Sequence, residues 1–72
     1  MAHVAKVIEL VGTSSSSWQD AVQQAVTEAS KTLRNISGVE VTNMTAQVEN
    51  NQIVSWRATV KIAFGIESDH SG

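Results

Sequence analysis

The chain has 72 residues, no cysteine, five basic and seven acidic residues, and a net charge of −2. This length allows one domain, the lack of cysteine excludes disulfides and thiolate metal sites, and five scattered cations form no basic stripe that would bind nucleic acid. A domain this small buries only about 60% of its unfolded surface, so we expect oligomerisation to supply the missing stability.

The residues near the N-terminus do not resemble a signal peptide, and no apolar run reaches the length needed to cross a membrane. These features predict a cytoplasmic protein without a membrane partner. The two histidines, His3 and His70, lie near opposite ends of the chain. A histidine-rich metal site within one chain is therefore not expected.

A strand is expected first, over residues 3–11, where only Lys6 and Glu9 interrupt the apolar residues. Gly12 is expected to end this strand and to open a polar turn that is rich in serine. Ser16 and Gln19 have the spacing of a capping box, which predicts the start of a helix.

The helix is expected to continue to Leu33 or Arg34. Its apolar residues recur at steps of three and four and form one stripe, made of Trp18, Ala21, Val22, Ala25, Val26, Ala29 and Leu33. Because alanine dominates this stripe, the helix can approach a sheet closely.

Two more strands are expected, over residues 39–49 and 52–64, joined by a turn at Asn50-Asn51 where asparagine tolerates positive φ. The apolar pattern of the first of them changes phase near residues 42–43, which predicts a β-bulge. The second alternates, with apolar residues at the even positions from Val54 to Phe64 and polar residues at the odd positions from Ser55 to Lys61.

The expected order of strand, helix, strand and strand predicts an α+β fold, with one helix on one face of a three-stranded sheet. The opposite face would carry the polar residues of the last strand and would meet water or a partner. Trp56 falls on the face under the helix, so we expect it to pack in the core or a subunit interface rather than against a ligand. Trp18, at the start of the helix, is expected to pack over the sheet edge or against a neighbouring subunit.

Arg57 points to the opposite, polar face. Two interpretations are open: an ion pair with Glu40 or Glu49 across the strands, which is favoured, and an anion held by the guanidinium.

The chain resembles the dodecin family over roughly residues 4–67, most specifically in the Val-Gly-Thr-Ser segment before the helix and the Val-Lys-Ile-Ala-Phe segment of the last strand. The resemblance implies one domain over residues 1–67, followed by a short polar tail at 68–72. It also implies a three-stranded antiparallel sheet of β-α-β-β order wrapped around the helix, and assembly with copies of itself into a hollow homododecamer.

The family is known for binding flavins without doing chemistry on them, between tryptophans of symmetry-related subunits. Carried onto this chain, the tryptophan position falls on Gly38, and that of a glutamine that hydrogen-bonds the flavin edge falls on Arg57. The positions of basic residues that hold a phosphate fall on Thr45 and Gly65. Because a glycine cannot stack and the other residues have also changed, we expect the flavin site to be weakened or lost.

A sub-group of the family also lacks this tryptophan, and some of its members have a Ser-Trp pair at the helix start, as Ser17-Trp18 does here. Calcium is associated with that sub-group, and carboxylates would be its ligands. The sequence does not choose a metal site among the candidates Glu9, Glu28, Glu40, Glu49 and Glu67.

The main hypothesis is a non-enzymatic oligomeric shell that binds, stores or buffers a small ligand or ion other than flavin. The alternative is a shell that stores riboflavin or flavin mononucleotide in a remodelled site. An enzyme is not expected, because the sequence offers no nucleophile–base pair, interior histidine or metal cluster.

Overall fold

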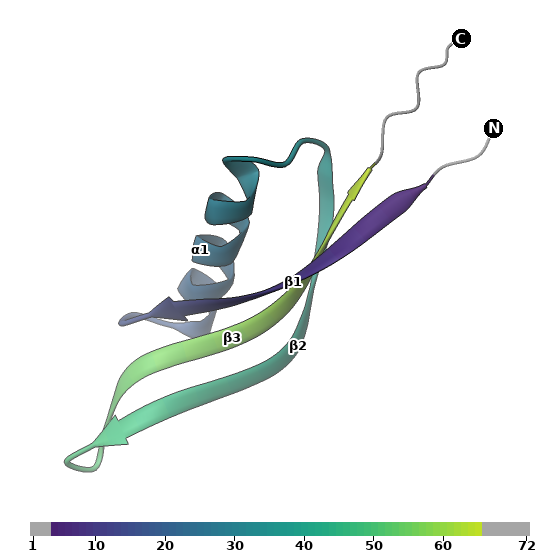
Figure 1. Cartoon of the computed structure of the whole chain (residues 1–72). Helices are drawn as coiled ribbons and strands as arrows, with labels where there is room; N and C mark the ends of the chain where they lie inside the picture. The colour runs from purple at the N-terminus through teal and green to yellow at the C-terminus, as the bar shows by residue number, and fades with distance from the viewer. Residues whose placement is uncertain (1–3, 66–72) are drawn as a thin grey trace, which may run out of the picture.

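The computed structural model describes residues 4–65, and the expectations for His3 and for the tail lie outside them. Figure 1 shows four elements: β1 (Ala5–Ser14), α1 (Trp18–Ser30), β2 (Ile36–Glu49) and β3 (Gln52–Gly65). The strands form one antiparallel sheet in the order β1-β3-β2, with α1 against one face. The predicted α+β architecture is therefore confirmed.

The first strand does not end where the sequence predicted. β1 runs through Gly12 to Ser14, and Gly12 is a buried partner of Ala58 in β3. A Cβ atom placed on Gly12 would lie 1.9 Å from the carbonyl oxygen of Ala21. Gly12 is thus the point where the first turn of α1 meets the strand backbone directly, and it does not break the strand.

The helix cap is Ser17, one residue later than the predicted Ser16. The Ser17 side chain accepts a hydrogen bond from the backbone N–H of Asp20 at 3.0 Å. Ser14 is buried, donates its hydroxyl to the Asp20 carboxylate at 2.6 Å and accepts from the Ser16 backbone N–H at 2.9 Å. These bonds satisfy donors that the start of a helix leaves without partners, and the Asp20 charge complements the helix dipole.

We expect Ser17→Ala to lower the free energy of unfolding by about 1 kcal/mol, because the Asp20 N–H loses its acceptor. Urea denaturation of the variant and the wild type at one protein concentration measures this loss. Ser15→Ala is the matched control, since Ser15 is exposed and lies outside the hydrogen bonds of the cap. An equal loss in both variants would contradict the assignment of the cap.

The helix ends earlier than predicted, at Ser30 rather than at Leu33 or Arg34. Leu33 still donates its backbone N–H to the carbonyl of Ala29 at 2.9 Å and packs against the core. Asn35 has φ of 61°, a conformation that asparagine tolerates, and it turns the chain into β2 three residues before the predicted start at residue 39.

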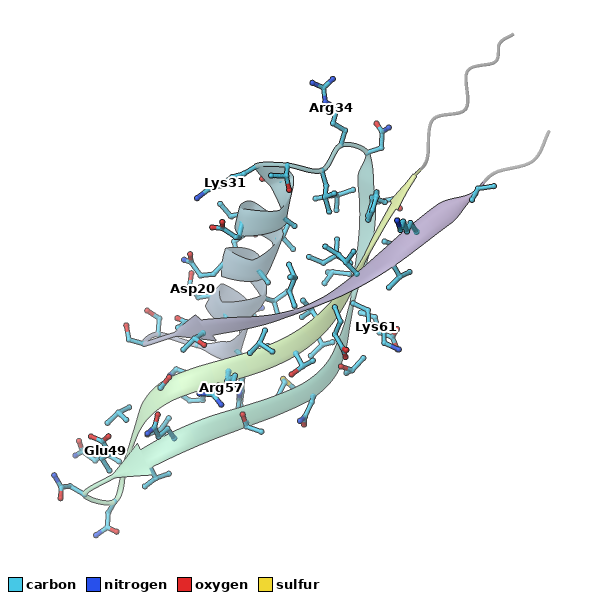
Figure 2. The ribbon with its side chains drawn as sticks, viewed as in Figure 1. Asp20, Lys31, Arg34, Glu49, Arg57 and Lys61 are labelled. Carbon is cyan, nitrogen blue, oxygen red and sulfur yellow. The ribbon has the colours of Figure 1, made fainter. Side chains whose placement is uncertain are left out.

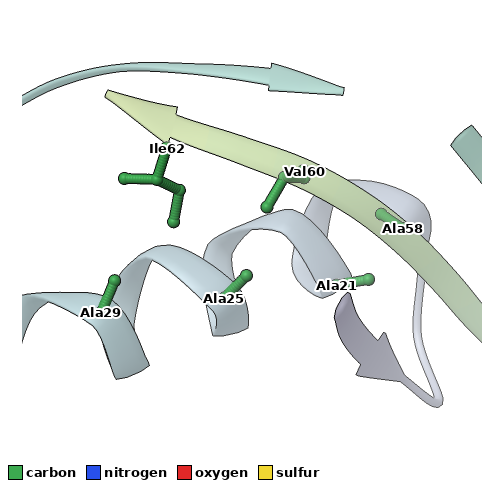
Figure 3. Packing of buried hydrophobic residues seen from close by; sticks show 6 residues of the cluster. All are labelled: Ala21, Ala25, Ala29, Ala58, Val60 and Ile62. Carbon is green, nitrogen blue, oxygen red and sulfur yellow. The ribbon is translucent and has the colours of Figure 1, made fainter. Parts of the chain in front are cut away.

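The core lies between α1 and β3, where small side chains allow close packing. Figure 3 shows three alanines of the helix against alternate residues of the strand, and the buried cluster consists of Ala21, Ala25, Ala29, Ala58, Val60 and Ile62. The predicted apolar stripe of the helix and the covered face of the last strand are both confirmed at these positions.

The predicted bulge in the second strand is present as a register shift between Val41 and Asn43. Val41 is opposite Val60 and Met44 is opposite Ala58, so the bulge returns the apolar residues of β2 to the face of the sheet that carries α1. The hairpin turn at Asn50 and Asn51 is also confirmed, with φ of 53° and 64°.

α1 lies mainly over β1 and β3, so the single chain leaves much apolar surface uncovered. The exposed large apolar residues are Val4, Val7, Val11, Val39, Val41, Met44, Val48, Ile53 and Val54. A monomer rarely exposes this much, which indicates contact with other chains. No helix in the part of the chain that the structure describes has the length and hydropathy to span a membrane.

Candidate ligand-binding face

The face of the sheet opposite α1 will be called the open face. Ala58, Val60 and Ile62 of β3 are buried against the helix. Because side chains alternate along a strand, the odd-numbered residues from 57 to 63 point to the open face. Each of these residues has one partner on β1 and one on β2. The resulting rows are Thr13–Arg57–Thr45, Val11–Thr59–Asn43, Glu9–Lys61–Glu40 and Val7–Ala63–Gly38.

Arg57 lies in a groove of about 420 Å³ on the β2–β3 hairpin (Figure 2). The lining residues are Thr45, Ala46, Gln47, Ser55 and Arg57. Thr45 is the direct cross-strand partner of Arg57, and Gln47 is that of Ser55. The structure therefore brings together two of the predicted ligand positions, Arg57 and Thr45, beside the polar side chains of Gln47 and Ser55.

The predicted ion pair of Arg57 is wrong within one chain. Glu40 lies opposite Lys61, and Glu49 lies opposite Gln52 next to the hairpin turn. The only ion pair within residues 4–65 joins Lys31 to Glu28 at 3.1 Å on the exposed side of α1. The prediction failed because the hairpin turn and the register shift between Gln47 and Val48 decide which residue of β2 faces Arg57.

Gly38 lines a second hollow on the open face, of about 500 Å³. Its other lining residues are Val7, Val39, Glu40, Lys61 and Ala63. A Cβ atom placed on Gly38 would meet no heavy atom within 4 Å, so the position has room for a side chain. Gly65 lines neither hollow: it lies at the end of β3, where its N–H donates to the carbonyl of Asn35 at 3.0 Å.

A tryptophan pair supports the Arg57 groove from the other face of the sheet. The rings of Trp18 and Trp56 meet edge to face, with centroids 4.6 Å apart and planes at 81°. The Trp18 indole N–H donates to the backbone carbonyl of Thr45 at 3.0 Å. Trp56 is thus half-buried against another aromatic ring, and Trp18 connects the start of α1 to the strand that lines the groove.

The sequence placed Ser55 on the open face with the other polar residues of the last strand, but it did not name Gln47. The signal for Gln47 was available, because it lies two residues from Thr45 and so shares its face in a strand.

The acidic candidates for a calcium site do not gather within one chain. Over residues 4–65, no group of three or more histidine, aspartate or glutamate side chains is placed to hold a metal ion. Glu67 lies outside these residues. Glu9 and Glu40 share a row of the open face, but Lys61 stands between them and its charge opposes a cation there.

The fold and the hollows of the open face define a small α+β ligand-binding protein. The chain belongs to the dodecin family, whose family model matches residues 4–67. A dodecin of Thermus thermophilus is 31% identical over 67 residues, which cover 93% of this chain and 97% of the relative. Family membership implies a non-enzymatic homo-oligomer that binds a small molecule.

Solved structures agree with this assignment. Dodecin from Streptomyces coelicolor matches with a TM-score of 0.86 and 40% identity, over 93% of this chain and 96% of that one. A calcium dodecin from Mycobacterium tuberculosis, described as calcium-chelating, matches with a TM-score of 0.77 and 26% identity, over 94% and 97% of the two chains. The fold is thus shared with a relative that chelates calcium.

Proposed function

We propose that this chain is the subunit of a dodecin-type dodecameric shell that binds and stores a planar ligand of the flavin class on its open face. One observation carries the proposal: Arg57 and Thr45, two family ligand positions, line one groove, and Gly38, a third, lines a hollow on the same face. The exposed apolar residues of β2 support the assembly, because copies of the chain would cover them.

The contacts of this site would differ from those of the family. Without an aromatic side chain at Gly38, a ring would lie against the apolar part of the second hollow, which Val7 and Ala63 provide. Gln47 carries an amide with both a donor and an acceptor in the Arg57 groove, so it can take over hydrogen bonds of the glutamine that the family has at position 57.

A second candidate is a shell for a small ligand or ion other than flavin, related to the sub-group without the tryptophan. The empty space at Gly38 favours it, because no residue there supplies the stacking surface. Calcium would need carboxylates from several copies of the chain, since one chain does not bring three together within residues 4–65.

A riboflavin titration of the ligand-stripped oligomer tests the proposed function. We expect a saturable rise in the fluorescence anisotropy of riboflavin at micromolar concentration, because a bound flavin tumbles with the oligomer. An absence of this rise with an intact oligomer would contradict flavin binding and favour the second candidate, and a screen of ions would then follow.

Gly38→Trp is expected to tighten riboflavin binding up to about tenfold per stacked ring, because an aromatic pair adds about 0.5–1.5 kcal/mol beyond the burial of area. The open space at Gly38 lets the oligomer accept the side chain. The same titration measures the change, with Gly38→Ala as the control that adds a methyl group but no ring. Unchanged affinity of Gly38→Trp in an intact oligomer would contradict a ligand placed against this residue.

A further inference from the structure

The Arg57 groove contains a cation with neutral polar neighbours. Arg57 stands between Thr13 of β1 and Thr45 of β2, and the rest of the lining is Ala46, Gln47 and Ser55. None of the lining residues within 4–65 is a carboxylate. By contrast, Lys61 stands between Glu9 and Glu40 in its own row. The open face therefore carries its uncompensated positive charge at the Arg57 groove.

A guanidinium has five N–H donors in a planar fork and no acceptor. The imide edge of a flavin offers an acceptor, a donor and an acceptor in turn, so its central N–H would face another donor at Arg57. A carboxylate offers two adjacent acceptors and a negative charge, which match the fork in a bidentate arrangement. The hydroxyls of Thr45 and Ser55 and the amide of Gln47 can donate further hydrogen bonds to the same oxygens.

From this charge and donor pattern we infer that the planar ligand of the open face presents an oxyanion, such as a carboxylate, to Arg57. The inference rests on the proposed function, because it names the chemical class of the ligand at the same site. The neutral imide edge then does not pair with the guanidinium of Arg57. Arg57 is thereby the residue that selects an acidic aromatic ligand over its neutral analogue.

The test uses two probes of equal shape, quinoxaline-2-carboxylate and quinoxaline-2-carboxamide, titrated calorimetrically into the ligand-stripped oligomer. We expect the carboxylate to bind about fivefold to tenfold more tightly than the amide, because hydrogen bonds to charged groups are roughly twice as strong as neutral ones. Arg57→Gln is expected to remove this preference. Arg34→Gln is the matched control, because it removes the same charge at an exposed position far from the groove (Figure 2).

A carboxylate preference that survives in Arg57→Gln, or that disappears equally in Arg34→Gln, would overturn the inference, as would equal or absent binding of both probes. Acetate that binds as tightly as the aromatic acid would overturn the planar nature of the ligand. If riboflavin binds while the two probes bind equally, the proposed function stands and this inference fails. If riboflavin does not bind but the preference depends on Arg57, flavin binding fails and the oxyanion site stands.

Discussion

Gly12→Ala is expected to lower the free energy of unfolding by about 3 kcal/mol, the upper part of the range for side chains that are too large for a packed site. The added Cβ would lie 1.9 Å from the Ala21 carbonyl oxygen and 2.9 Å from the Ala21 carbonyl carbon. Both atoms belong to the helix backbone, so no side-chain rotation can relieve the overlap. The first turn of α1 would have to move away from β1, and the contacts of Ala21 and Ala25 with the sheet would weaken.

Urea denaturation at one protein concentration measures this effect, since the stability of an oligomer depends on its concentration. Gly38→Ala is the matched control, because a Cβ there meets no heavy atom within 4 Å. We expect the control to stay within about 0.5 kcal/mol of the wild type, as surface substitutions usually do. Equal stability of Gly12→Ala and Gly38→Ala would show that α1 does not dock on Gly12 as described.

Val60→Asp is expected to prevent folding and assembly. Val60 is fully buried beneath α1 and stands between Leu10 and Val41 in the sheet. A carboxylate at this position would have no cation or donor in the apolar cluster, and a buried charge left without a partner costs about 3–5 kcal/mol. A chain of this size has a total stability near the low end of about 5–15 kcal/mol, so the loss would leave little of the folded state.

Circular dichroism and light scattering of the purified variant measure the loss of helix and of the oligomer. Gln52→Asp is the control, because it adds the same charge to the same strand at an exposed position. The control should fold and assemble as the wild type does. A soluble oligomer of normal size from Val60→Asp would show that this face of β3 is not the one that α1 covers.

Local pattern was sufficient to predict the elements of this fold. The alternation of β3 placed Val60 under the helix, and the phase change near Asn43 predicted the bulge, because period and phase are properties of neighbouring residues. Local signals were weaker at the ends. Gly12 was predicted to end β1, because glycine often marks the end of a strand. The structure shows instead that a glycine is needed there because the backbone of Ala21, nine residues further along the chain, packs directly against it.

The sequence predicted which face of the sheet carries the candidate site, and the strand register in the structure corrected which residues lie beside Arg57. The sequence placed Arg57 on the open face, but it paired Arg57 with Glu40 or Glu49, and the structure places Thr13 and Thr45 beside it instead. Cross-strand partners depend on every bulge between the turn and the residue in question, and a shift by one residue exchanges the faces of all that follow. The hydrogen bond from Trp18 to Thr45 also came only from the structure, because it depends on how the start of α1 docks on the sheet.

The sequence by itself determined the number and order of the elements, the buried face of β3 and the presence of Arg57 on the opposite face. Hydrophobic period and turn residues act within a few positions, so these features need no knowledge of distant contacts. Only the tertiary structure decided that Gly12 receives the helix and that Lys61 stands between two glutamates. It also decided that, among residues 4–65, the cross-strand and groove neighbours of Arg57 are all neutral. Those features depend on which residues of distant segments come into contact. Strand register and helix docking determine these contacts.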